Sequence, residues 1–148
     1  MKTPLLAGLA VVLLLGADAA KEDVKKEKEK LQGTWLVITV EERGQSKQDN
    51  ENHQIVFAGD ELSVKRGDFI FLKGKIKIDP SKKPMEIDFE ITEAAKDEQK
   101  GKTGLGIYSV EGDTLKLCAN EPGSTDRPKD FTAQADSKHI LLTCQRQK

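Results

Sequence analysis

The chain has 148 residues, of which 36% are hydrophobic and 33% are charged, a size and composition that fit one domain with a single core. Lysine and arginine number 24 against 25 aspartate and glutamate residues, so the net charge is −1 and the chain lacks the basic excess of nucleic-acid-binding proteins. Composition therefore argues against two domains and against a nucleic-acid partner.

The beginning of the chain has the pattern of a secretory signal peptide. Lys2 gives it a positive start, an apolar run covers Leu5 to Leu15, and Ala17-Asp18-Ala19 offers small residues at the cleavage position. The run is shorter than the roughly 20 apolar residues of a membrane-spanning helix. We therefore expect residues 1–19 to be removed, no membrane span to remain, and the mature protein, beginning at Ala20, to be periplasmic or extracellular.

A charged leader at residues 20–30 precedes the predicted domain at residues 31–148. Lys21 to Lys30 is almost wholly charged, and Val24 and Leu31 lie seven residues apart, which fits one narrow apolar stripe on a short helix. Interleaved glutamates cancel the field that a polybasic tether would need. The leader is thus expected to be solvated or to form a short helix.

From Thr34 onward, strand-like runs alternate with turn signals, and no long apolar helical face is present. Gly59-Asp60, Arg66-Gly67-Asp68 and Gly112-Asp113 suit tight hairpins. An open sheet would leave two exposed edges, which closure into a barrel removes. We predict an all-β, up-and-down antiparallel barrel of 8–9 strands, with a β-sandwich as the alternative. The candidate strands are Thr34 to Glu42, His53 to Ala58, Glu61 to Arg66, Asp68 to Asp79, Met85 to Thr92, Thr103 to Val110, Thr114 to Ala119, a short one near Phe131, and His139 to Gln145.

The strictest alternation lies in Met85 to Thr92. Its apolar side chains point to one face, and the carboxylates of Glu86, Asp88 and Glu90 point to the other. Cation sites and carboxylate catalysis need oxygens that converge from different segments. Carboxylates along one strand diverge, so this pattern predicts an exposed acidic row.

At Gly33-Thr34-Trp35 the chain resembles the Gly-x-Trp signature that opens the first strand of lipocalins, where the tryptophan plugs the closed end of the barrel. In that family a basic residue near the end of the last strand packs over the indole in a cation–π contact. Arg146 is the matching position here. The resemblance thus implies a structural signature made by Gly33, Trp35 and Arg146.

A more specific resemblance covers nearly all of the mature chain. It is to a family of small exported lipocalin-like domains of uncharacterised function, found in many copies in planctomycete bacteria. This resemblance implies fold and export and transfers no catalytic residue. The chain departs from the pattern at Cys144 and in the unusually polar loop Gln45 to Asn52. The stretches that carry the resemblance are Leu31 to Trp35, Asp79 to Pro84, Gly106 to Tyr108, Gly112 to Cys118, and Arg127-Pro128.

Residues that could bind a metal or act as a nucleophile are scattered. His53 and His139 are the two histidines, and Cys118 and Cys144 lie far from any Cys-x-x-Cys or His-x-x-x-His spacing. The neighbours of Cys118 would neither lower its thiol pKa nor orient a base. Gly101 to Gly104 is followed by a strand-like run, so it is a turn and not a phosphate loop. The sequence predicts no metal, no cofactor and no enzyme activity.

The two cysteines of an exported chain suggest a disulfide, but the predicted strand order argues against one. If a strand near Phe131 separates their strands, Cys118 and Cys144 lie two strand spacings apart. If that segment is a loop, each cysteine lies opposite the far end of the other strand. Both arrangements exceed the Cα separation limit of about 7 Å, so we predict free thiols.

Two functions remain open. The first is a cell-envelope interaction module that acts through the outer surface of a filled barrel, with an envelope protein as partner. The second is a binder of a small apolar ligand in the barrel interior. Aromatic residues are only 5% of the chain, which favours the first.

Overall fold

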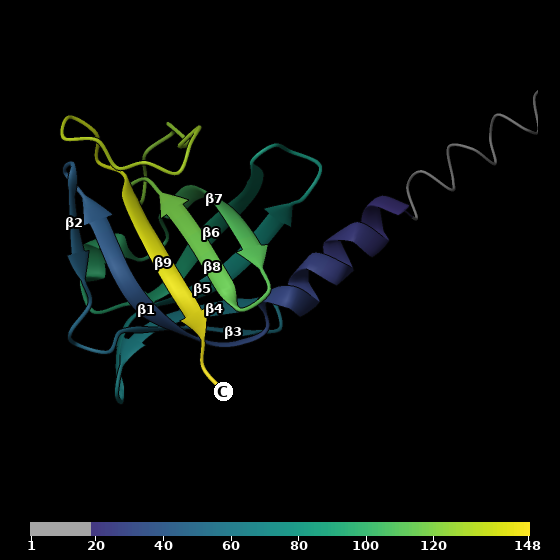
Figure 1. Cartoon of the computed structure of the whole chain (residues 1–148), viewed down its shortest axis with the longest axis horizontal. Coiled ribbons are helices and arrows are strands. Elements are labelled where there is room, and N and C mark those ends of the chain that lie inside the picture. Colours follow the sequence, from purple (N-terminus) through teal and green to yellow (C-terminus); the bar gives the residue numbers. More distant parts are fainter. Residues whose placement is uncertain (1–18) are drawn as a thin grey trace, which may run out of the picture.

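The computed structural model describes residues 19–148, so the predicted signal peptide lies outside the described residues except for its last residue. Residues 19–31 are helical, and a closed antiparallel barrel of eight strands follows, extended by one further strand (Figure 1). The predicted lipocalin-like all-β barrel is confirmed. The elements are β1 (Gly33–Glu42), β2 (Gln45–Gln48), β3 (Gln54–Ala58), β4 (Glu61–Arg66), β5 (Phe69–Asp79), β6 (Met85–Ala94), the 3-10 turn η1 (Asp97–Gln99), β7 (Thr103–Glu111), β8 (Thr114–Ala119) and β9 (Ile140–Arg146).

Each barrel strand pairs with its neighbour in the order β1-β3-β4-β5-β6-β7-β8-β9, and β9 closes the ring by pairing with β1. The hairpin glycines Gly59, Gly67 and Gly112 all have positive φ, as the turn signals predicted. We call the end where β1 begins the closed end, and the end where β1 finishes the open end. No helix in residues 19–148 is long and apolar enough to cross a membrane.

The strand predicted near Phe131 is absent, because residues 120–139 form a loop. Phe131 and Ala133 pack from this loop onto the outer face of the sheet, over Ile107 and Cys118. These two residues are therefore apolar because they cover the outside of the barrel wall, and not because they belong to one of its strands.

The polar segment from Gln45 to Asn52 is not wholly a loop, because Gln45–Gln48 form β2. This strand pairs with residues 39–42 of β1. It lies along the same edge of β1 as β3, which pairs with residues 33–36. All four of its residues are exposed. A strand that faces water on both sides has no apolar alternation, so the sequence did not reveal it.

The acidic row of β6 faces outward, as predicted. In the pairing with β5, Glu90 lies opposite Lys75. Asp88 Oδ1 lies 2.6 Å from Nη2 of Arg127, whose Nη1 also donates to the carbonyl of Gly106 at 2.8 Å. The row therefore neutralises cations along the wall and ties down the loop of residues 120–139.

The barrel interior is filled with apolar side chains from its middle to its closed end. Toward the open end, inward-facing side chains that pack on this core are only partly buried. Met85 and Val110, toward the closed end, are also only partly buried, so burial falls off toward both ends of the barrel. The buried residues are Leu31, Trp35, Val37, Ile55, Phe57, Leu62, Ile76, Ile78, Ile87, Tyr108, Leu115 and Cys144, and the partly buried ones toward the open end are Val40, Val64, Phe89, Leu117 and Leu142.

The helix contacts the barrel along one stripe, as the spacing of Val24 and Leu31 predicted. Leu31 is fully buried and Val24 packs against the core. Lys28 Nζ lies 2.6 Å from Asp60 Oδ1, and the Tyr108 hydroxyl is 3.4 Å from a carboxylate oxygen of Glu27. The earlier turns of the helix project away from the closed end (Figure 1).

The two cysteines are free and buried, as predicted. Residue 131 lies in a loop, so β8 and β9 pair directly, with Cys118 opposite Leu141 and Cys144 opposite Leu115. Cys118 packs on the outer face and Cys144 in the interior. Burial raises the pKa of Cys118 to about 11 and that of Cys144 to about 12. Both thiols are therefore protonated at neutral pH.

Candidate functional site

The predicted signature residues meet at the closed end. Trp35 is completely buried and donates from Nε1 to the carbonyl of Leu31 at 2.8 Å. Arg146 lies opposite Trp35 in the β1–β9 pairing, and its guanidinium carbon is 4.2 Å from the indole centroid. Gly33 has φ +114°, a conformation that side chains rarely adopt, and a Cβ there would meet Arg146 Nη1 at 3.5 Å.

Arg146 also holds the end of the helix. Its Nη2 donates to the carbonyl of Lys30 at 2.6 Å and its Nη1 to the carbonyl of Gln32 at 2.8 Å, while Nε lies 3.4 Å from Asp113 Oδ1. Its hydrogen-bonding groups are thus largely used within the fold. This arrangement is structural, because it leaves the guanidinium little capacity to bind a ligand.

The remaining candidates from the sequence are not brought together. His139 lies at the end of the loop of residues 120–139, with Nε2 3.9 Å from Asp126 Oδ2. Cys118 faces the outside of the wall, and Cys144 faces the core. Gly101 is part of the turn before β7, as predicted. None of these residues forms a reactive constellation within residues 19–148.

His53 instead belongs to a group of side chains in the open half of the barrel that was not predicted from the sequence. We call this group, made of Asp49, Glu51, His53, Arg66 and Phe71, the rim cluster. The loop between β2 and β3 supplies the first three residues, β4 ends at the fourth, and β5 supplies the fifth. The cluster therefore joins three segments on one side of the barrel.

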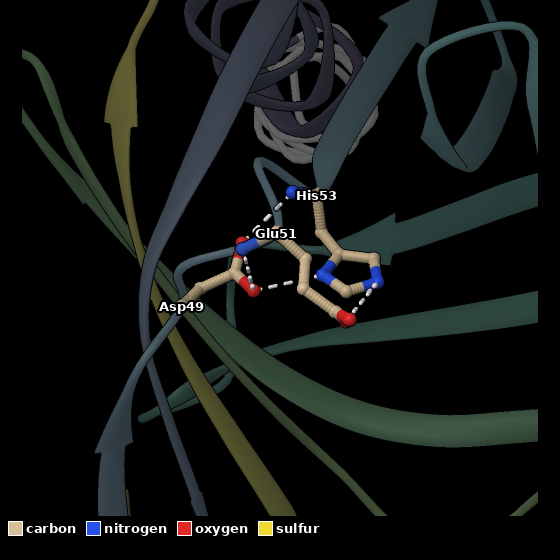
Figure 2. A group of neighbouring side chains, drawn as sticks. All are labelled: Asp49, Glu51 and His53. Carbon is tan, nitrogen blue, oxygen red and sulfur yellow. Dashed lines mark hydrogen bonds and ion pairs between the residues drawn. The ribbon is translucent and has the colours of Figure 1, made fainter.

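Asp49 fixes the orientation of the His53 ring. Its side chain is 6% exposed, Oδ1 lies 2.8 Å from His53 Nδ1, and Oδ2 accepts from the His53 backbone N–H at 2.8 Å. Burial alone would raise the pKa of Asp49, but hydrogen bonds from His53 and from the backbone N–H of Glu51 outweigh it and hold the pKa below its usual value. Figure 2 shows Asp49 on the Nδ1 side of the ring and the Glu51 carboxylate on the Nε2 side.

The Glu51 carboxylate lies between the His53 imidazole and the Arg66 guanidinium, and both of these groups lie beside the ring of Phe71. Its carboxylate is 3.7 Å from His53 Nε2 and 3.3 Å from Arg66 Nη1, yet its side chain is 62% exposed. The Phe71 ring lies 5.4 Å from the His53 ring and 5.8 Å from the Arg66 guanidinium. Phe69 stacks edge-on against Phe71 at 4.8 Å and is 53% exposed.

The rim cluster does not suit a metal ion, although ligand atoms of Asp49, Glu51 and His53 all lie within 4.8 Å of one another. Both oxygens of Asp49 already accept hydrogen bonds. Only His53 Nε2 and Glu51 are left, fewer than the three or four protein ligands of a typical zinc site. The charge of Arg66 beside Glu51 opposes a cation as well.

One signal in the sequence could have pointed to this group. Asp49, Glu51 and His53 alternate at every second position, which in an extended segment places three side chains on the same side. Arg66 and Phe71 join the cluster through the pairing of β4 with β5, and the spacing of residues along the sequence does not predict that register.

Comparisons of the chain with protein-family models, with curated proteins and with solved structures give no match. The fold and the geometry of the two ends of the barrel therefore carry the functional argument.

Proposed function

We propose that this protein is an exported, non-enzymatic lipocalin-like domain that acts as an interaction module of the cell envelope. The observation that carries the proposal is the filled interior of the barrel, where Trp35, Phe57 and Tyr108 occupy the space that a large internal ligand would need. Four hollows on the described surface lie outside the barrel wall, three along the loop of residues 120–139 and one beside the helix.

The chemistry of the described residues supports a binding role. The two thiols are buried with raised pKa values, so they are poor nucleophiles at neutral pH. The Asp49–His53 pair resembles the base of a catalytic triad, but its free nitrogen faces the carboxylate of Glu51. A carboxylate there does not provide the activated hydroxyl or thiol of such a triad.

Export rests on the first nineteen residues and on the resemblance to the exported planctomycete family. N-terminal sequencing of the native protein, combined with cell fractionation, tests it. We expect a chain that begins at Ala20 in the periplasmic or extracellular fraction. An intact Met1 on cytoplasmic material would contradict the proposal.

A second candidate function is the binding of a small apolar ligand through the open end. It is favoured by one observation: inward-facing side chains such as Val40, Val64 and Leu142 are only partly buried there. Native mass spectrometry and an apolar-dye titration of the purified protein separate the two functions. An interaction module with a filled barrel gives no saturable dye uptake, whereas stoichiometric uptake supports the second function.

A further inference from the structure

We propose that a hollow beside the helix binds an acidic polysaccharide, a linear polymer of sugars that carry carboxylate or sulfate groups. The inference deepens the proposed function and rests on it, because it names the chemistry of the partner of an envelope interaction module. The hollow has a volume of about 380 Å³, within the range of about 300–1,000 Å³ that is usual for ligand sites. We call it the helix hollow. It is lined from the helix by Lys21, Lys25 and Lys28 and from the turn between β3 and β4 by Gly59 and Asp60.

The helix separates charges that are mixed along the sequence. Lys21, Lys25 and Lys28 are spaced by four and three residues, so they lie on one side of a helix with 3.6 residues per turn. Of the four acidic residues in the helix, only Glu29 lines the helix hollow. The glutamates that interleave with lysines in the sequence therefore leave one lysine-rich face.

Two of these lysines have no counter-charge within the fold. Lys28 Nζ pairs with Asp60 Oδ1 at 2.6 Å, which neutralises both groups. Lys21 and Lys25 are exposed and form no ion pair with any residue from 19 to 148. The helix hollow therefore presents two unpaired ammonium groups, on residues about 6 Å apart along the helix axis, against the single carboxylate of Glu29. A chain with closely spaced anionic groups can contact both at once.

The two walls of the helix hollow are fixed to each other. Gln32 Oε1 accepts from the backbone N–H of Gly59 at 2.7 Å, and Gln32 Nε2 donates to the carbonyl of Gly59 at 3.1 Å. The same nitrogen donates to the carbonyl of Lys28 at 3.1 Å. Together with the ion pair between Lys28 and Asp60, these bonds form the hollow before a ligand arrives, so little ordering entropy is lost on binding.

The lining of the helix hollow suits a sugar polymer better than other anions. Val24 and the methylene stems of the lysines supply apolar surface, against which the C–H faces of sugar rings can pack. Among residues 19–148 no aromatic side chain lines the hollow, so the stacking that single-stranded nucleic acids use is missing. A flat bilayer cannot enter a recess between a helix and a turn, whereas one polymer chain can.

Titration calorimetry of the purified protein with polygalacturonate, dextran sulfate and uncharged dextran tests the proposal. We expect saturable binding of a charged polymer that weakens as salt rises, and no measurable binding of dextran. The two charged polymers distinguish carboxylate from sulfate as the recognised group. Failure of both to bind at low salt would overturn the inference, and so would tighter binding of single-stranded DNA or of phosphatidylglycerol vesicles. Because the protein is purified, either result is independent of the fractionation that tests export.

A pair of double variants gives the sharper test. Lys21→Gln combined with Lys25→Gln removes the two unpaired ammonium groups, so binding of the charged polymer should weaken by about tenfold or more. The slope of log affinity against log salt should also become shallower by about 1–2. Lys26→Gln combined with Lys30→Gln is the matched control, because it removes the same charge from the same helix at positions that do not line the hollow. We expect the control to bind within about twofold of the unmodified protein.

Both double variants keep the buried Leu31 and the bonds of Arg146 to the end of the helix. Amide NMR spectra of the two variants establish that they are folded. Equal weakening in both would mean that net charge alone governs binding, and it would overturn the assignment of the site to the helix hollow.

Discussion

The two ends of the barrel use the same pair of groups, an arginine over an aromatic ring, for different purposes. At the closed end the guanidinium of Arg146 is 4.2 Å from a fully buried Trp35 and bonds to two backbone carbonyls. At the open end Arg66 is 5.8 Å from Phe71, and its ion pair is with the exposed Glu51. The number of internal partners, and not the residue types, separates a structural arginine from one that is available to a ligand.

The largest effect should come from the aromatic residue at the closed end. Trp35→Ala removes a completely buried side chain and should lower the free energy of unfolding by about 3–5 kcal/mol. Phe69→Ala at the open end, where the ring is half exposed, should change it by less than about 0.5 kcal/mol. Urea denaturation measures both. Equal midpoints for the two variants would remove the distinction between the ends.

The next largest effect is the difference in stability loss between substitutions of the two arginines. Arg146→Gln leaves the carbonyls of Lys30 and Gln32 without their charged donor and should cost about 1.5–3 kcal/mol. Arg66→Gln breaks one exposed ion pair and should cost at most about 1 kcal/mol. The same denaturation experiment at two salt concentrations should show salt sensitivity mainly for Arg66. A larger stability loss at Arg66 would mean that the rim cluster is structural.

Asp49→Asn tests whether the acid limit of stability lies at the open end. The folded pKa of Asp49 is depressed, so its ionised form stabilises the fold above its ordinary pKa near 3.8, and this stabilisation is lost as the pH falls through the folded pKa. The variant should lose about 1–2 kcal/mol at pH 7 and show a shallower decline between pH 4 and pH 2. A decline as steep as that of the unmodified protein would assign the acid limit to other carboxylates.

The smallest effect concerns the alkaline limit, which we assign in part to the closed end. Burial, together with the nearby charge of Glu27, raises the pKa of Tyr108 well above its ordinary value of 10.0. Stability is therefore complete below that value and falls as the pH rises, because the unfolded tyrosine ionises first. Tyr108→Phe should cost only about 0.5 kcal/mol at pH 7 and reduce the decline above pH 10. The buried thiols contribute equally in both proteins, so an unchanged decline would exclude Tyr108.

These two ends also differ in how far the sequence predicted them. Gly33, Trp35 and Arg146 were predicted through a resemblance, and their contact follows from closure of the barrel between its first and last strands. The rim cluster could not be predicted in the same way. Phe71 lies beside both His53 and Arg66, and it is the residue of β5 that the irregular register between Val64 and Lys65 of β4 leaves without a partner.

Other misses have equally local causes. Phe131 is apolar because it covers the wall from outside, and a short apolar residue pattern does not distinguish a covering loop from a strand. Gln45–Gln48 form a strand through backbone pairing alone, with all side chains in water. An alternating pattern indicates a strand with one buried face. It therefore detects neither a strand whose side chains are all exposed nor a loop whose apolar side chains pack onto the outside of the barrel.

The position of the helix determines which end of the barrel is presented to the medium when the protein is attached through its N-terminal segment. Residues 19–31 leave the barrel from the closed end, while the rim cluster lies in the open half and the loop of residues 120–139 joins the open ends of β8 and β9 (Figure 1). A linker, label or solid support attached ahead of Ala20 would therefore hold the molecule at its closed end and leave the open end free. The charged helix acts as a spacer, and the open end is presented outward to the medium.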